Sequence, residues 1–472
     1  MSSPIVTVLF VAGIFGLFFL DRDPQAKTSK ALWIPVVWFL IAGSRPVSGW
    51  LQAGPLPWAA LPAASADEYT ESNPINSLIF LTLLLAGLVV LAHRGPRVTR
   101  LLKVNLPLVC FFSYCALSTV WSEYPGIAFR HWMRSFGDLV MVLAVMTEMN
   151  PGAALRRLIA RTGFLLLPIS VLLIKYYTNL GQVYSYLGDV MYTGVTQHKN
   201  TLGSTCMILG LGFLWRFLES YRTRSERHRE RRMMAHATCF AMVGWLLWMA
   251  KSATSSSCLF MTGGFLAVIT LCGFARKLAV VHLLMVLLVS LALFALFFDP
   301  TGNLLQSVGR DSTLTGRVMV WRHALSLAGN PVFGTGFESF WLGSRLQRMW
   351  AYFPGDRINQ AHNGYLEVYL NLGWCGLALL AVLLGTGYRN IISALRRDRY
   401  TGAFRLAYYA AAVIYNLTEA AFRMGSFTWI FLLLAVVEVP TVAGRRAERS
   451  EPVVDHTSAF AFSAISRSQE AV

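Results

Sequence analysis

The stretch "QAHNGYLEVYLNLGWCGLALLAVLLGTG", residues 360–387, joins a long apolar run to a polar beginning. The run is long enough to cross a bilayer as a helix, which takes about 20 apolar residues. On that helix Asn363, Glu367 and Asn371 stand at i, i+4 and i+8 and form one stripe. A carboxylate costs about 2.5–3.5 kcal/mol at the bilayer centre and less near its edge. The stripe is therefore predicted to face protein or a water-filled cavity. Hydrogen bonds to a neighbouring helix would be the simplest explanation of the stripe alone.

The composition of the whole chain is that of a membrane protein. Of 472 residues, 55% are hydrophobic and only 14% are charged, which is too little polar surface for a soluble protein of this length. Apolar runs that predict transmembrane helices lie at 3–20, 31–43, 76–92, 104–120, 128–147, 158–176, 201–218, 237–251, 257–275, 279–298, 363–386, 404–420 and 425–440. We therefore expect an all-α, polytopic integral membrane protein with about 12–13 transmembrane helices. The first run lacks a basic n-region and a cleavage site, which favours a retained span over a signal peptide.

The net charge of +17 is explained by orientation in the membrane. Basic residues concentrate in the connections 93–103, 155–161, 219–232, 388–402 and 444–449, which are alternate connections between the predicted spans and therefore share one side of the membrane. Short basic loops mark the cytoplasmic side of a membrane protein. The charge therefore argues against nucleic-acid binding and predicts which loops face outward.

Four segments follow from this topology. Residues 1–298 form an N-terminal transmembrane bundle, 299–361 a large periplasmic loop, 362–440 the C-terminal transmembrane helices and 441–472 a disordered cytoplasmic tail. Inside the loop, Thr313 or Thr315 can cap a helix through "GRVMVWRHALSLA", which "GNP" then ends. We therefore expect a helical subdomain there.

Ionisable and amide side chains from four separate spans gather at the predicted outer edge of the membrane. They are Arg130, Arg134 and Asp138; His198, Lys199 and Asn200; His362, Asn363 and Glu367; and Asn416, Glu419 and Arg423. Isolated structural ion pairs would be scattered over both faces. Convergence on one face predicts a binding or catalytic site at the outer interface.

The external loop breaks the charge rule. It carries six arginines: Arg310, Arg317, Arg322, Arg345, Arg348 and Arg357. Long loops translocate largely regardless of charge, which explains the arginines without a ligand. The alternative is an anion site, because the guanidinium fork matches phosphate oxygens. The aromatic residues between them predict a core for the subdomain, with sugar stacking or membrane contact as the alternative.

Several other chemistries find no support in the sequence. There is no G-x-x-x-x-G-K-[ST], H-E-x-x-H or G-x-S-x-G, which argues against ATP hydrolysis, a zincin and a serine hydrolase. The seven cysteines lie in apolar runs without a C-x-x-C pair, so neither a disulfide framework nor a zinc site is indicated. The "DRD" at 21–23 has the form of a metal-binding D-x-D but indicates a solvated helix end on the cytoplasmic side. We expect no metal and no cofactor.

Five segments carry a resemblance to a known family. They are "STVWSEYPGIAFRHWMRSFGDL", "GVTQHKNTLGST", "GRDSTLTGRVMVWRHAL…NPVFGTGFESFW", "HNGYLEVYLNLGWCGL" and "NLTEAAF". In order and spacing they resemble the O-antigen ligase and Wzy-type polysaccharide polymerase superfamily, most of all its exopolysaccharide polymerase branch. The likeness covers roughly residues 30–440.

The resemblance implies a fold, an activity and a site. Members of this family are GT-C-like glycosyltransferases of the bacterial inner membrane, which use polyprenyl-diphosphate-linked glycans as donors at the periplasmic face. Ligases commonly carry arginine where this chain has "QHKN". The implied residues are Arg317 or Arg322 as the essential loop arginine, His362 as the essential histidine, and Lys199 or Arg130 as a second cation on the diphosphate. We expect Arg134, Arg310, Asn363, Glu367 and Glu419 to bind substrate around them.

The implied reaction is a single displacement with inversion at the anomeric carbon. Cationic side chains can stabilise a departing diphosphate without a metal, and a histidine can accept the proton of a sugar hydroxyl. The acceptor is another lipid-linked repeat unit in a polymerase, or the lipid A–core in a ligase. A transporter or flippase for lipid-linked sugar is the alternative of a different class, and it predicts repeat symmetry and charges at mid-membrane. The expected partners are a polyprenyl-diphosphate-linked oligosaccharide, the bilayer and, by resemblance only, chain-length and export proteins.

Overall fold

The computed structural model describes residues 3–22, 28–51, 73–184, 188–222, 228–297, 314–354 and 357–440. The tail predicted at 441–472 lies outside these ranges. Most of the described residues are helical. Two short strands, β1 (Gln182–Tyr184) and β2 (Val190–Tyr192), pair antiparallel with Val183 opposite Met191.

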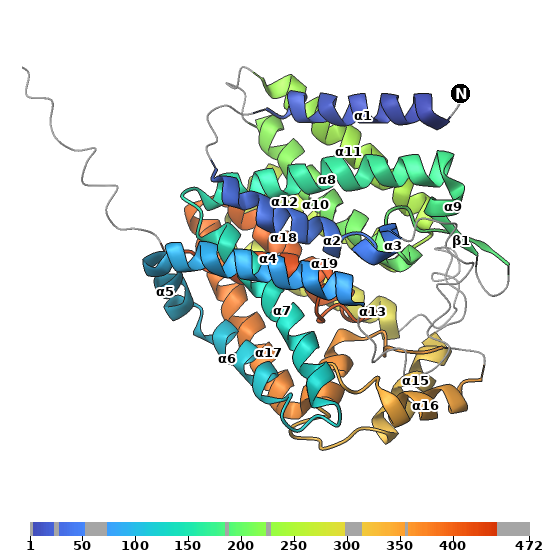
Figure 1. The fold of residues 1–472 in the computed structure, drawn as a ribbon. Helices are drawn as coiled ribbons and strands as arrows, with labels where there is room; N and C mark the ends of the chain where they lie inside the picture. The colour runs from blue at the N-terminus through green and yellow to red at the C-terminus, as the bar shows by residue number, and fades with distance from the viewer. Residues whose placement is uncertain are drawn as a thin grey trace, which may run out of the picture. The chain divides into compact units, whose positions relative to one another are not determined.

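The helices follow one another along the chain as shown in Figure 1. They are α1 (Ser3–Leu20), η1 (Lys30–Leu32), α2 (Trp33–Ala42), α3 (Val47–Leu51), α4 (Pro74–His93), α5 (Gly95–Val104), α6 (Leu106–Leu117), α7 (Pro125–Met146), α8 (Pro151–Tyr176), α9 (Thr178–Gly181), α10 (Lys199–Arg222), α11 (Arg229–Ala250), α12 (Ala253–Leu271), η3 (Phe274–Arg276), α13 (Leu278–Phe297), α15 (Leu314–Ser326), α16 (Gly343–Tyr352), α17 (Gly364–Arg397), α18 (Arg399–Tyr415) and α19 (Phe427–Val436).

Each of the predicted apolar runs coincides with a helix, and the expected all-α, polytopic membrane fold is confirmed. Among the described residues, 7 helices are long and apolar enough to cross a membrane: α4, α8, α10, α11, α12, α13 and α17. Helices α5 and α6, bent by 91°, make up to 8 if the pair is one span. The other apolar helices are shorter, or like α7 carry charges within their length. The expected 12–13 transmembrane helices thus exceed the 7 or 8 that are both long enough and apolar enough among the described residues.

The interior of the bundle is built around α10, α18 and α19. Every residue of α19 is buried, and the hydroxyl of Tyr408 in α18 donates to the carbonyl of Ile208 in α10 at 2.6 Å. Helices α4 and α13 instead leave most of their apolar side chains exposed. Helices that are apolar on all sides are typical of a bilayer environment, so we interpret these outer faces as contacts with lipid.

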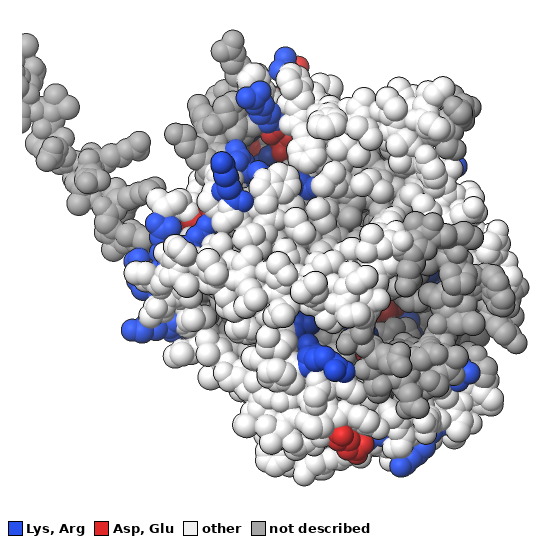
Figure 2. Space-filling model, in the orientation of Figure 1, with Lys and Arg blue, Asp and Glu red and all other residues white. Residues whose placement is uncertain are grey.

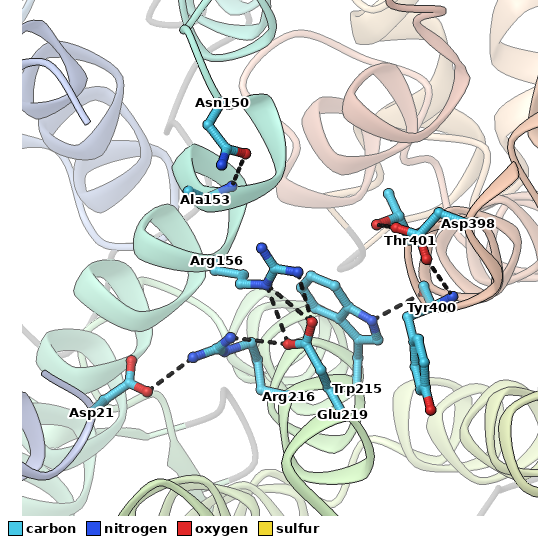
Figure 3. A network of polar contacts seen from close by, with 10 residues as sticks. All are labelled: Asp21, Asn150, Ala153, Arg156, Trp215, Arg216, Glu219, Asp398, Tyr400 and Thr401. Atoms are coloured by element: carbon cyan, nitrogen blue, oxygen red, sulfur yellow. Dashed lines mark hydrogen bonds and ion pairs between the residues drawn. The ribbon is translucent and has the colours of Figure 1, made fainter. Parts of the chain in front are cut away.

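Charged groups tie the ends of α1, α8 and α10 together (Figure 3). Nη2 of Arg216 lies 2.9 Å from Oδ1 of Asp21, and its Nη1 lies 3.0 Å from Oε2 of Glu219. Nη2 of Arg156 completes the network 2.7 Å from Oε1 of Glu219. Burial alone would raise the pKa of Asp21, but the neighbouring His236 and Arg216 outweigh burial and lower it. The first residue of the "DRD" motif is therefore an ion-pair partner inside the fold, and its interpretation as a solvated helix end was wrong.

Basic side chains gather at this same end of the bundle. Figure 2 shows Lys and Arg concentrated on the side where α5 lies in Figure 1. Arg97, Arg100 and Lys103 of α5 are exposed there, while Nη2 of Arg94 pairs with the carboxylate of Glu148.

A break in α17 attaches the external segment to the bundle. Gly373 has a φ of +64° inside the helix. Around the break, the N–H of Trp374 donates to the carbonyl of Pro331 at 2.9 Å, and the N–H of Thr335 donates to the carbonyl of Leu370 at 3.2 Å. A Cβ at position 373 would lie 2.3 Å from the carbonyl oxygen of Val332. The backbone groups released by the kink thus bind the loop that leads from α15 to α16.

The described part of the external segment packs on the start of α17. Ala324, Phe340, Ala361 and Leu370 form a buried cluster, with Trp321 packed against it. The helix predicted through "GRVMVWRHALSLA" is α15, and part of the aromatic set serves as the core of the segment, as predicted.

The kink gives a first prediction. Gly373→Ala should lower the thermal unfolding temperature of the detergent-solubilised protein by several degrees, because alanine resists this φ and its methyl group overlaps the Val332 carbonyl. The control is Gly385→Ala in the same helix, where nothing lies within 4 Å of the added Cβ. Equal melting of both variants would contradict this account of the kink.

Candidate active site

The carboxylate of Glu419 contacts both His362 and Arg317. Nδ1 of His362 lies 3.2 Å from Oε2 of Glu419. Nη2 of Arg317 lies 3.5 Å from Oε1 of the same carboxylate, and Nη1 of Arg317 donates to the carbonyl of Thr418 at 2.7 Å. Glu419 is buried, with 8% of its surface exposed, whereas the histidine and the arginine remain partly exposed. The carboxylate thus joins α15, the start of α17 and the segment after α18.

The joint between α17 and α18 brings this cluster together. The N–H of Gly364 donates to the carbonyl of Asn416 at 2.8 Å. A Cβ at position 364 would lie 1.9 Å from Oδ1 of Asn416, so the approach requires glycine. The same Oδ1 accepts the N–H groups of Ala421 and Phe422 at 2.8 Å and 2.9 Å, which turns the chain back after α18. The imidazole and the carboxylate therefore face each other across a fixed backbone contact.

His362 is held in a backbone conformation that a side chain disfavours. Its φ is +50°, in the left-handed region that costs about 1–2 kcal/mol for a residue with a Cβ. The preceding Ala361 is bonded on both sides: its N–H donates to Oε1 of Glu367, and its carbonyl accepts Nε1 of Trp321 at 2.7 Å. The other oxygen of Glu367 accepts Nε1 of Trp341 at 2.8 Å. Such strain persists only where surrounding contacts over-determine it, and it often marks functional sites.

These bonds explain the polar stripe at the start of α17. Glu367 holds the backbone next to the histidine, Asn363 caps the helix, and Oδ1 of Asn371 accepts the N–H groups of Ser339 and Phe340 at 2.8 Å and 2.9 Å. The stripe faces protein, as the sequence indicates. Glu367 and Asn371 anchor the external segment, whereas Asn363 fixes the start of α17, and the sequence did not reveal these positioning roles.

Among the described residues, the other loop arginines named from the sequence make no recorded contact with the cluster. Arg322 lies five residues after Arg317, about 140° further round α15, and is exposed. Arg310 lies outside the described residues. Of the two arginines that the resemblance allowed, Arg317 is the one that contacts Glu419.

Lys199 begins α10 and is partly exposed. Its helix packs against α12 and α18. Helix α18 ends at Tyr415, four residues before Glu419. Helix α10 therefore packs against the helix that leads to the central carboxylate.

Arg130 and Arg134 lie in a different place, a groove between α4 and α7. The guanidinium of Arg134 stands 4.4 Å from the ring centroid of Phe80. One turn deeper, Oδ1 of Asp138 accepts Nε1 of Trp38 at 2.8 Å. No contact that the structure records among the described residues joins this groove to Arg317.

A cavity of about 200 Å³ adjoins the cluster on the other side of Glu367. Its polar lining comprises His131, Ser135, Glu338, Asn359, Glu367, Asn371 and Arg423, and its aromatic lining comprises Phe111, Phe337, Trp341, Phe422 and Trp429. Carboxylates, amides and aromatic faces together suit a sugar, because they accept hydroxyl protons and stack on the ring.

Glu338 is a functional candidate that the sequence did not single out. It has a φ of +49°, its Oε1 accepts the N–H of Met424 at 3.3 Å, and its carbonyl oxygen lies 3.3 Å from Nδ1 of His131. The glycines on its N-terminal side, Gly334 and Gly336, are the local signal of an irregular backbone there. Among the described residues, no group of three His, Cys, Asp or Glu side chains is arranged to hold a metal ion.

Residues 237–381 match the model of a family described as O-antigen ligase. This match covers less than a third of the chain and shows a likeness to the O-antigen ligase family. The chain is a multi-pass membrane protein. The matched region contains Arg317, His362 and Glu367, whereas Glu419 and Lys199 lie outside it.

The chain is also similar to a curated relative, the exopolysaccharide production protein ExoQ of Rhizobium meliloti (strain 1021). The two are 24% identical over 295 residues, which cover 60% of this chain and 64% of the relative. The chain therefore spans less than two thirds of that relative's length.

The positive φ of His362 predicts that glycine at this position is more stable than alanine, the reverse of their order in a helix. His362→Gly should melt at a higher temperature than His362→Ala, because glycine adopts a φ of +50° freely. At the exposed helical position Arg348 the order should reverse, since glycine destabilises a helix interior by about 1 kcal/mol relative to alanine. Unfolding temperatures are measured in one detergent. If the alanine variant melts higher than the glycine variant at both positions, the backbone of His362 is not strained.

Proposed function

We propose that the protein is a glycosyltransferase that joins exopolysaccharide repeat units at the periplasmic face of a bacterial inner membrane. In this proposal it moves a glycan from a polyprenyl-diphosphate donor to a sugar hydroxyl. Support comes from the O-antigen ligase family match and from the name of the curated relative. The observation that carries the proposal is the buried Glu419 carboxylate between an imidazole and a guanidinium.

The proposed face follows from charge. Basic loops mark the cytoplasmic side, and basic side chains gather on the side where α5 lies (Figure 2). Arg397 at the end of α17 pairs with Glu438, whose carbonyl accepts Nδ2 of Asn105 directly after α5. His362 precedes the first residue of α17 and so lies at the other end of that helix. With this orientation, we propose that the Glu419 cluster lies at the periplasmic end of its helices.

His362 is suited to act as the general base. With its Nδ1–H donated to Glu419, Nε2 carries a lone pair that can accept a proton, and the carboxylate stabilises the imidazolium that forms. The acceptor oxygen then forms a bond to the anomeric carbon, while the bond from that carbon to the diphosphate oxygen breaks. The electron pair leaves with the diphosphate, the hydroxyl proton passes to Nε2, and the anomeric configuration inverts.

Arg317 and Lys199 are suited to stabilise the leaving diphosphate. Arg317 uses one N–H on the carbonyl of Thr418 and lies beside Glu419, which fixes its fork and leaves further N–H groups for a ligand. Preorganised cations at a developing anion lower the barrier without reorganisation during the reaction. We propose that these cations serve without a bound metal.

A ligase that transfers glycan to lipid A–core is the second candidate. The description of the matched family favours it, and the chemistry at His362 would be the same. The relative's name favours exopolysaccharide synthesis. The two candidates differ in the acceptor and are separated by the product.

Surface polysaccharide from a deletion strain tests the proposal. Chains carrying His362→Ala or Arg317→Ala should insert normally, make no high-molecular-weight polymer and accumulate lipid-linked single repeat units. Arg348→Ala, an exposed arginine in the same segment, is the matched control and should restore polymer. Gels of polymer and of lipid A–core, run in parallel, separate polymerase from ligase. Normal polymer from the His362→Ala strain would refute the general base.

Glu419→Gln tests the carboxylate separately. An amide can donate to Nδ1 and stabilise the wrong tautomer, so the rate of transfer should fall by about 10²–10⁴-fold. Glu123→Gln is the control, because Glu123 is paired with Arg345 at the surface of the external segment. Equal initial rates for the two variants, measured with purified protein in lipid nanodiscs, would exclude a catalytic role for Glu419.

A further inference from the structure

The groove between α4 and α7 is built like a site for an anionic amphiphile. It offers about 400 Å³, with Asn73, Asn76 and Ser77 at the N-terminal end of α4. Its walls are mainly apolar: Trp38, Phe80, Leu81, Leu84, Ile127, Phe129, Met133 and Met424. Two guanidinium groups, Arg130 and Arg134, line it, and none of its lining residues is acidic.

Arg134, which lines this groove, has one donor without a partner in the protein. Its Nε is buried and has no hydrogen-bond partner, and its guanidinium lies over the Phe80 ring. The nearest carboxylate in α7, Asp138, already accepts Nε1 of Trp38 and the N–H of Gly425, each at 2.8 Å. A buried guanidinium with an unsatisfied N–H favours an anionic ligand, and phosphate oxygens fit its fork.

The groove adjoins the cavity beside the Glu419 cluster, because His131 and Met424 line both spaces. Glu338, Trp341 and Glu367 also line the cavity, and Glu367 accepts the N–H of the residue before His362. The groove and the histidine are thus linked through the lining of one cavity.

We propose that the α4–α7 groove binds the phosphate-bearing lipid of the acceptor, whose sugar occupies the adjoining cavity. This inference rests on the proposed glycosyl transfer, in which both substrates are carried by lipids and must reach one base from the membrane. Arg317 and Lys199 serve the donor, and Arg130 and Arg134 serve the acceptor. The phosphate belongs either to a second lipid-linked repeat unit or to lipid A–core.

Photo-crosslinking in nanodiscs tests the groove without requiring turnover. The probe is a polyprenyl diphosphate that carries a benzophenone in its tail and no glycan. Wild-type protein should be labelled on peptides of α4 and α7, and the double variant Arg130→Gln/Arg134→Gln should lose at least nine tenths of that label. Arg100→Gln, an exposed arginine of α5, is the control and should be labelled like the wild type.

A second variant protects the test against misfolding. Leu81 is half exposed and lines the groove from α4, so Leu81→Trp should fill the groove while leaving both arginines in place. It should reduce the label in α4 and α7 to the same extent. Two results would overturn the proposal. One is a wild-type protein without label in α4 and α7, and the other is a label in α4 and α7 that neither variant reduces.

Competition and kinetics complete the experiment. Suppression of the label by excess lipid-linked repeat unit identifies a polymer acceptor, and suppression by lipid A–core identifies a ligase acceptor; suppression by neither would overturn the proposal. Arg134→Gln should raise the KM for the acceptor at least tenfold with the donor KM unchanged. Failure of the wild type to transfer sugar while labelling persists would refute the proposed function and leave the groove as an anionic lipid site.

Discussion

The N–H of Gly364 donates to the carbonyl of Asn416 at the point where α17 begins and α18 ends. Both groups belong to helix termini, which leave backbone donors and acceptors without partners inside their own helix. In the hydrocarbon core no water can bind such backbone groups, and each N–H or C=O left without a partner costs several kcal/mol. The bond between Gly364 and Asn416 gives a partner to one group of each helix end. The same pairing sets the distance between His362, two residues before α17's first glycine, and Glu419, three residues after Asn416.

The cluster around Glu419 follows from this joint. A buried carboxylate needs partners that offset its desolvation, and here they are an imidazole and a guanidinium. The external segment supplies the guanidinium from α15, and the kink at Gly373 holds that segment against α17. The positive φ of His362 is maintained because the backbone of Ala361 is hydrogen-bonded to the side chains of Glu367 and Trp321. Each contact thus depends on another that is distant in the sequence.

Local patterns in the sequence were sufficient for the helices and for part of the site. Apolar runs predict the helices because a membrane span must be apolar over its own length. The convergence of His362 and Glu419 follows from topology alone, since both lie at the same end of consecutive antiparallel spans. The structural role of Glu367 was beyond such reasoning, because its partners are an indole 26 residues away and a backbone N–H before its own helix. The choice between Arg317 and Arg322 was equally out of reach, since both lie on α15 and only the docking of that helix separates them.

A double-substitution cycle on the initial rate of glycosyl transfer tests the central claim most directly. Glu419→Gln, Arg317→Gln and the double variant are compared with the wild type in the same nanodiscs. Residues that act as one unit show strong coupling, whereas independent residues contribute additively in free energy. The account predicts that the double variant is no slower than the slower single variant. Rate losses that multiply would show that the carboxylate and the guanidinium act separately, and the shared site would have to be abandoned.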